Sequence, residues 1–167
     1  MYKLRLVLFE ECHRDCGGCC NKDWDLKKLP VCRDFRGYDL IMLTGGEPML
    51  RPNIVYGIIE EIRTQTKAPI YLYTALLKDR KALGNILDQI DGVTVTLHTQ
   101  EDVATFMEFD NYYVGRPKMS YRLNIFKGVG PVVCLPRWNV KDDIVWIKDC
   151  PLPDGETLMR LDIEPVL

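Results

Sequence analysis

The sequence predicts an α/β protein built on a parallel sheet, in the form of a partial (incomplete) parallel β/α barrel. Strand-like apolar runs alternate along the chain with amphipathic helical patterns, and the runs are rich in β-branched and aromatic residues. Alternation of this kind is typical of right-handed crossovers between neighbouring parallel strands. No internal repeat or linker interrupts it, and we therefore expect a single domain over residues 1–167.

The expected strands recur at regular intervals. The first, "YKLRLVLFE", alternates and then becomes continuously apolar. The second, "DLIMLT", is a short apolar run of the kind found in strands that are covered on both faces. Five strands are predicted, over residues 2–10, 39–44, 69–74, 92–99 and 121–126.

Helical patterns separate these strands. Pro52 suits the first turn of the helix that follows the second strand. Thr99 is expected to cap the helix after the fourth strand, with Asp102 as its capping-box partner. Helices are predicted over residues 52–67, 79–90 and 99–109, and a short or irregular one within 22–38, which contains a proline.

The alternation is expected to become irregular after residue 126. Only Lys127 to Gly130 separate "YRLNIF" from the next apolar run, "PVVCL", whereas a parallel return needs a dozen or more residues. We therefore predict that these two runs form a glycine-containing hairpin or lie in different parts of the fold. A further strand is expected at residues 143–147.

Composition narrows the functional classes. A net charge of −2 gives no electrostatic reason to expect general nucleic-acid binding, although a nucleotide substrate remains compatible with it. The first residues lack a signal peptide, and no apolar stretch approaches the roughly 20 residues needed to cross a bilayer. We expect a cytoplasmic protein with no membrane partner, in which cysteine thiols stay reduced.

The stretch "ECHRDCGGCCNKDW" gathers cysteines on one loop after the first strand. Cys12, Cys16 and Cys19 have the spacing C-x3-C-x2-C, and the odd total of seven cysteines argues against a closed disulfide framework. Three thiolates from one loop can hold three irons of a 4Fe–4S cluster and leave the fourth iron without a protein ligand. The alternative is a structural zinc site with Cys20 or Cys32 as the fourth ligand, although no second C-x2-C pair is present.

A second motif, "TGGEP", follows the second strand. Gly45 and Gly46 would let the backbone approach a ligand closely, and Glu47 could accept a hydrogen bond from an ammonium group. The alternative is a strand-to-helix turn in which the glycines supply positive φ angles. Because ligand sites in such sheets lie at the carboxyl ends of the strands, we expect both motifs at the same end of the sheet.

Together the two motifs resemble the signature of the radical S-adenosylmethionine (radical SAM) superfamily, over roughly residues 1–126. The resemblance implies a 4Fe–4S cluster on Cys12, Cys16 and Cys19, with S-adenosylmethionine chelating the open iron. It also implies that the turn Gly45–Glu47 binds the amino group of that cosubstrate. Such enzymes take an electron from a donor such as flavodoxin and cleave S-adenosylmethionine into methionine and a 5′-deoxyadenosyl radical, which abstracts hydrogen from a substrate.

The resemblance extends to polar residues near the ends of later strands. Family members often place ribose or carboxylate contacts there, which makes Thr74, His98 and Asn124 candidate cofactor-binding residues. Helix caps or satisfied buried polar groups are the alternative for each of them. His13 and Arg14, in the cysteine loop, are expected to be solvated.

Within the superfamily, "CHRDCGGCCNKDW" is most similar to the small activating proteins of glycyl radical enzymes, especially the anaerobic ribonucleotide reductase activator. That similarity implies a protein substrate. Modification of a small molecule or nucleotide is the alternative within the enzyme class, and a non-catalytic, zinc-stabilised binding module is the alternative from another class. The residue before the third cysteine is often aromatic in these activators, whereas here it is Gly18.

The remaining cysteines and tryptophans are not expected to belong to the cluster site. Trp138 and Trp146 are predicted to be core or interface anchors. The cysteines outside the triplet, which have no assigned role, are Cys20, Cys32, Cys134 and Cys150.

Overall fold

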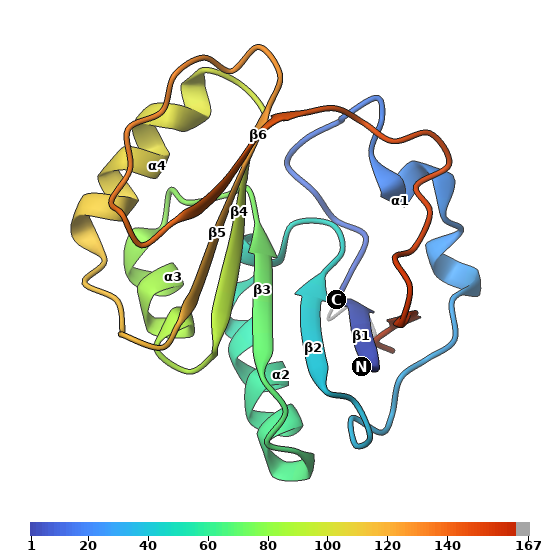
Figure 1. The fold of residues 1–167 in the computed structure, drawn as a ribbon. Helices are drawn as coiled ribbons and strands as arrows, with labels where there is room; N and C mark the ends of the chain where they lie inside the picture. Colours follow the sequence, from blue (N-terminus) through green and yellow to red (C-terminus); the bar gives the residue numbers. More distant parts are fainter. Residues whose placement is uncertain (163–167) are drawn as a thin grey trace.

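A computed structural model describes residues 1–162, and in it seven parallel strands form one open sheet (Figure 1). The strand order is β6-β5-β4-β3-β2-β1-β7. The strands are β1 Lys3–Val7, β2 Leu40–Thr44, β3 Ile70–Thr74, β4 Gly92–Leu97, β5 Ser120–Phe126, β6 Asn139–Ile144 and β7 Glu156–Arg160. The predicted α/β class with an unclosed parallel sheet is confirmed.

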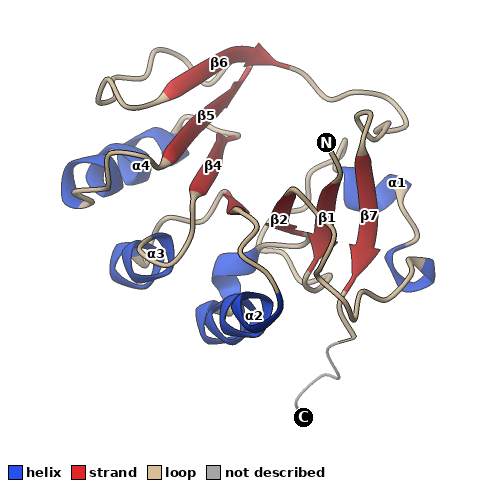
Figure 2. Ribbon diagram, turned by 60° about the horizontal axis from the view of Figure 1, so that its bottom comes forward, coloured by secondary structure: helices blue, strands red, loops and turns tan. Residues whose placement is uncertain are grey.

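The three long helices cover one face of the sheet, as Figure 2 shows. The helices are α1 Cys20–Asp23, α2 Pro52–Gln65, α3 Arg80–Leu87 and α4 Glu101–Tyr112, with 3-10 turns η1 Leu26–Lys28 and η2 Pro48–Leu50. Pro52 begins α2 as predicted. Thr99 does not cap α4, however; instead the Asp102 carboxylate accepts the backbone N–H groups of His98 and Thr99, at 2.8 and 3.0 Å.

The two faces of the sheet differ in chemistry because successive side chains of a strand point to opposite sides. The helix-covered face is apolar and fully buried, with side chains such as Leu6, Leu72 and Leu123. The other face carries mainly polar side chains, and no long helix of residues 1–162 covers it. The expectation that residues 39–44 form a strand covered on both faces is confirmed at its centre, because Ile41 and Leu43 are buried on the helix side and Met42, on the helix-free side, is only 2% exposed.

The chain after residue 126 departs from the predicted hairpin. Residues 131–135 form no strand, and β6 pairs with β5 in parallel, so the hairpin prediction is wrong. The strand begins earlier than the predicted 143–147, and residues 127–138 supply the dozen residues that a parallel return needs. The two runs do lie in different parts of the fold, which was the other expectation.

A buried carboxylate holds this helix-free crossover in place. Asp110, in α4, is 3% exposed and accepts hydrogen bonds from the Leu135 N–H at 2.8 Å and the Trp138 indole N–H at 2.7 Å. The Arg137 guanidinium donates to the same carboxylate at 2.8 Å. These contacts replace the packing that a crossover helix would provide, and they confirm Trp138 as a core residue.

The last strand was not predicted. β7 pairs in parallel with β1, at the opposite edge of the sheet from β6, and Arg5 in β1 forms an ion pair with Glu156 at 2.9 Å. Residues 145–155 therefore run from one edge of the sheet to the other, as Figure 1 shows. We call this segment the strap.

Candidate functional site

The two motifs meet at the carboxyl end of the sheet. The Glu47 N–H donates to the Glu11 carbonyl at 2.7 Å, which joins the turn after β2 to the cysteine loop after β1. Gly46 has φ 54°, and a Cβ atom there would collide with the Glu11 carbonyl oxygen. Gly45 has φ 85°, and a Cβ atom there would collide with Val7. These glycines therefore allow the turn after β2 to pack closely against the cysteine loop and β1.

The carboxylate of Glu47 is buried and hydrogen-bonded to the neighbouring strand. It is 3% exposed and accepts from the Met49 N–H at 3.0 Å, the Ala75 N–H at 2.8 Å and the Thr74 hydroxyl. Thr74, a predicted site residue, therefore contacts Glu47 directly. A carboxylate has roughly four acceptor positions, so about one has no protein donor among the described residues.

Cys12, Cys16 and Cys19 line one cavity of about 380 Å³. Cys12 is exposed, and the other two thiols are half-buried. The Cys19 N–H donates to the Cys16 carbonyl at 3.2 Å, which forms a tight turn between them. Burial, followed by the negative charge of Cys19, raises the pKa of the Cys16 thiol.

Within residues 1–162, no three Cys, His, Asp or Glu side chains are grouped closely enough to hold a metal ion. In a 4Fe–4S cluster each thiolate binds a different iron, so the cysteines need not converge on one point. The cluster and the zinc site both stay predictions.

A second cavity, of about 290 Å³, adjoins the first. Cys19 and Trp24 line both cavities. The second cavity also brings together all six residues that the sequence suggested for the cofactor: Gly45, Gly46, Glu47, Thr74, His98 and Asn124. The triplet and the candidate cofactor residues therefore share one continuous region at the strand ends.

Aromatic rings enclose one side of this second cavity. The His98 ring stacks on Phe126 with centroids 5.0 Å apart and lies 5.9 Å from the ring of Trp146. Its Nδ1 atom is buried and has no hydrogen-bond partner among the described residues. Burial, followed by the positive charge of Arg14, lowers the pKa of His98, so the ring is neutral at pH 7.

Arg14 is not a solvated loop residue, contrary to expectation. Its guanidinium forms an ion pair with Asp102, and both side chains are largely buried. It also donates to the Ala75 carbonyl at 3.4 Å. Since Asp102 simultaneously binds the N–H of His98, Arg14 fixes the cysteine loop to the ends of β3 and β4. His13 is exposed, as predicted.

The strap contacts the cysteine loop in two places that sequence reasoning did not find. Trp146 packs so closely on Gly18 that a Cβ atom there would collide with its ring. Cys20 and Cys150 form a disulfide with a Cα–Cα distance of 5.5 Å. The expectation that the cysteines stay reduced is therefore wrong for these two, whereas Cys32 and Cys134 are free. That Cys20 and Cys150 are not cluster ligands stays a prediction.

No family model, curated protein or solved structure matches this chain. Of the helices described within residues 1–162, none has the length and apolar character needed to cross a membrane. What the chain does must therefore be argued from the chemistry of the two adjoining cavities.

Proposed function

We propose that this chain is a radical SAM enzyme in which Cys12, Cys16 and Cys19 hold a 4Fe–4S cluster. The observation that carries the proposal is the position of Cys19, which lines both the cysteine cavity and the cavity of Gly45, Glu47 and His98. A cosubstrate in the second cavity would adjoin the one iron that three thiolates leave without a protein ligand. When bound, the cluster would supply the electron that cleaves S-adenosylmethionine reductively, and the resulting 5′-deoxyadenosyl radical would abstract hydrogen from the substrate.

The turn Gly45–Glu47 would bind the ammonium group of S-adenosylmethionine. Its position is fixed before any ligand arrives, because Thr74 and Ala75 hold the Glu47 carboxylate and Glu11 holds the Glu47 N–H. A preorganised acceptor loses little conformational freedom on binding. The same hydrogen bonds keep the remaining acceptor position of the carboxylate available to a cation.

The other side of the cavity suits a nucleoside. The rings of Phe126 and Trp146, with centroids 4.5 Å apart, would form an apolar wall against which a nucleoside base could pack. Neutral His98 and the amide of Asn124 can donate to or accept from ribose hydroxyls or a carboxylate.

The substrate would reach the cavity from the helix-free face of the sheet. A glycyl radical enzyme and a small molecule or nucleotide are both compatible with that approach. The non-catalytic zinc-stabilised module is the rival from another class, and it differs in the metal that the triplet would hold.

The experiment that tests the proposal is anaerobic reconstitution followed by product analysis. Iron and sulfide per chain are measured, dithionite or reduced flavodoxin is added, and 5′-deoxyadenosine and methionine are followed by chromatography. Wild type and Cys134→Ala, a matched cysteine control outside the loop, should bind the cluster and form both products slowly. Cys16→Ala should lose both properties. Zinc binding without iron and sulfide would overturn the proposal, as would equal product from Cys16→Ala and wild type.

A further inference from the structure

The helix-free face of the sheet contains another hollow, of about 470 Å³, on strands β3 to β6. The strand register places Tyr73, Thr94, Arg122 and Asn139 in one row across these four strands. Lys141, paired with Asn124, belongs to the next row. Side chains that are register partners in a parallel sheet share a face, so this whole group lines the hollow.

The hollow adjoins the proposed cofactor cavity without coinciding with it. Tyr73 and Asn124 line both spaces, whereas Arg122 and Lys141 line only the hollow. A ligand that occupies the hollow can therefore extend past Asn124 into the proposed cofactor cavity, which His98 also lines.

The hollow carries two positive charges that no carboxylate neutralises. Within residues 1–162, neither Arg122 nor Lys141 forms an ion pair, and the Arg122 guanidinium only lies over the Tyr71 ring, 5.5 Å from its centroid. Arg5, on the same face, is paired with Glu156 at 2.9 Å. Among the described residues, no aspartate or glutamate lines the hollow.

A buried hydroxyl in the same row lacks a partner. Thr94 is 2% exposed, and its Oγ1 atom makes no hydrogen bond within the described part of the chain. Buried polar atoms in folded proteins are almost always hydrogen-bonded, since an unsatisfied one is destabilising. The Thr94 hydroxyl is thus a donor that is available to a ligand in the hollow, beside the Arg122 side chain.

We propose that the hollow binds an oxyanionic group of the substrate, a phosphate ester or a carboxylate. Arg122 supplies a planar fork of donors suited to two oxygens, Lys141 a second positive charge, and Thr94 a neutral hydrogen bond. Assigning the anion to a substrate rests on the proposed function, whereas binding of the anion itself does not.

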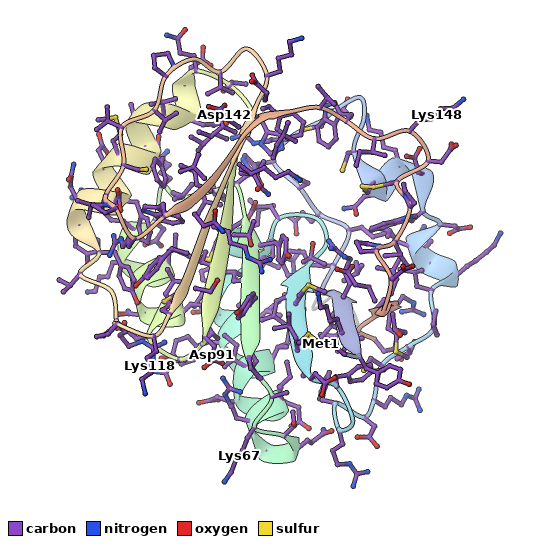
Figure 3. The ribbon with its side chains drawn as sticks, in the orientation of Figure 1. Met1, Lys67, Asp91, Lys118, Asp142 and Lys148 are labelled. Atoms are coloured by element: carbon purple, nitrogen blue, oxygen red, sulfur yellow. A yellow bond between two sulfur atoms is a disulfide. The ribbon has the colours of Figure 1, made fainter. Side chains whose placement is uncertain are left out.

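The test is a titration of the full, cluster-free chain with inorganic phosphate at constant ionic strength, followed by backbone amide chemical shifts. Saturable shifts are expected around Thr94, Arg122 and Lys141. Arg122→Gln should weaken phosphate binding at least about tenfold, and Lys141→Gln and Thr94→Val should each weaken it several-fold. Lys67→Gln is the matched control, because this exposed lysine follows α2 and lies at the opposite end of the molecule from Asp142 of β6, as Figure 3 shows.

A parallel titration with succinate distinguishes the two sources of the anion. Tighter binding of phosphate assigns a phosphate ester, and tighter binding of succinate assigns a carboxylate. Equal phosphate affinity in wild type and Arg122→Gln, or no saturable shift at this face, would overturn the proposal. Displacement of phosphate by methionine would also overturn it, because the anion would then be the cosubstrate carboxylate. The titration uses the cluster-free chain, so its result does not depend on whether the iron–sulfur cluster can be reconstituted.

Discussion

The hydroxyl of Thr74 donates a hydrogen bond to Oε1 of Glu47 at 2.5 Å, although both residues are almost completely buried. Glu47 follows β2 and Thr74 ends β3, so this contact joins the turn of one strand to the end of the next. Burial of a carboxylate is costly unless donors compensate it, and here three protein donors do so. The glutamate of the "GGE" motif therefore orients the turn as well as offering an acceptor to a ligand.

Replacing Glu47 with glutamine should lower the free energy of unfolding by about 1–3 kcal/mol. The Met49 and Ala75 N–H groups donate to different oxygens of the Glu47 carboxylate. Whichever way the glutamine amide is turned, its nitrogen would therefore replace one of these acceptors and face a backbone N–H. Thr74→Val removes two hydrogen bonds, the one donated to Glu47 and the one accepted from the Leu76 N–H, and should cost about 1–3 kcal/mol. Urea unfolding measures both changes.

Thr64→Val is the matched control for Thr74→Val, because the Thr64 hydroxyl donates to a carbonyl on the exposed side of α2. Its effect should stay within about 0.5 kcal/mol. Wild-type stability in Glu47→Gln would contradict the assigned orienting role.

Alanine at Gly46 and at Gly57 should have opposite effects on stability. A Cβ atom at Gly46 collides with the Glu11 carbonyl and is attached to a backbone at φ 54°, so we expect a loss of about 2 kcal/mol or more. Gly57 lies within α2, where a Cβ atom meets nothing within 4 Å, and alanine there should stabilise by about 0.5–1 kcal/mol. Thermal unfolding of the two variants checks the sign. If alanine destabilises the protein equally at both positions, the close contact of Gly46 with the Glu11 backbone is not what requires a glycine there.

The fold was predictable from sequence where the determining signal is local. Strands β1 to β5 and helices α2 to α4 follow hydrophobic periodicity, and neighbouring strands joined by helices pair in sequence order. The connection to β6 has no helix, so its parallel pairing depends on Asp110, whose partners lie some 25 residues away. β7 has no strong pattern of its own and is defined by pairing with β1.

The same distinction applies to the site. The triplet and the turn Gly45–Glu47 are compact motifs whose position at the strand ends follows from topology alone. The ion pair of Arg14 with Asp102 spans 88 residues, and nothing in the sequence near either residue indicates it. Trp146 likewise reaches Gly18 only because the strap crosses between the two sheet edges.

His98 should make stability depend on pH. Its folded-state pKa lies below the ordinary 6.5 because of burial and then the charge of Arg14, a lowering that the Asp102 carboxylate partly opposes. The unfolded chain therefore binds the proton more readily, and the free energy of unfolding should fall as pH drops below about 6.5. Replacing His98 with phenylalanine, which can stack on Phe126, should flatten this dependence between pH 7.5 and 5.5. If the pH dependence of the free energy of unfolding is unchanged in this variant, it arises from other groups, including His13, whose pKa is also lowered.

The strap is held to the cysteine loop by the Cys20–Cys150 disulfide and by Trp146. The two cysteines of the disulfide are 130 residues apart in sequence. A crosslink of this span restricts the unfolded chain substantially. The disulfide lies next to Cys19, a proposed cluster ligand, so the redox state of this pair bears directly on the proposed site.

Loss of the disulfide should destabilise the chain by about 2–5 kcal/mol, since a crosslink of this span chiefly reduces the entropy of the unfolded state. Cys150→Ser and reduction of wild type should lower the unfolding midpoint equally, whereas Cys134→Ser, at a free and half-buried thiol, should have a smaller effect. Reductant should then change nothing further in Cys150→Ser. Hydrogen exchange should speed up in residues 145–155 and in the cysteine loop while the β1–β5 core stays protected. If the strap alone exchanges faster, Cys20 does not restrain the cysteine loop, and the disulfide acts only on the C-terminal segment.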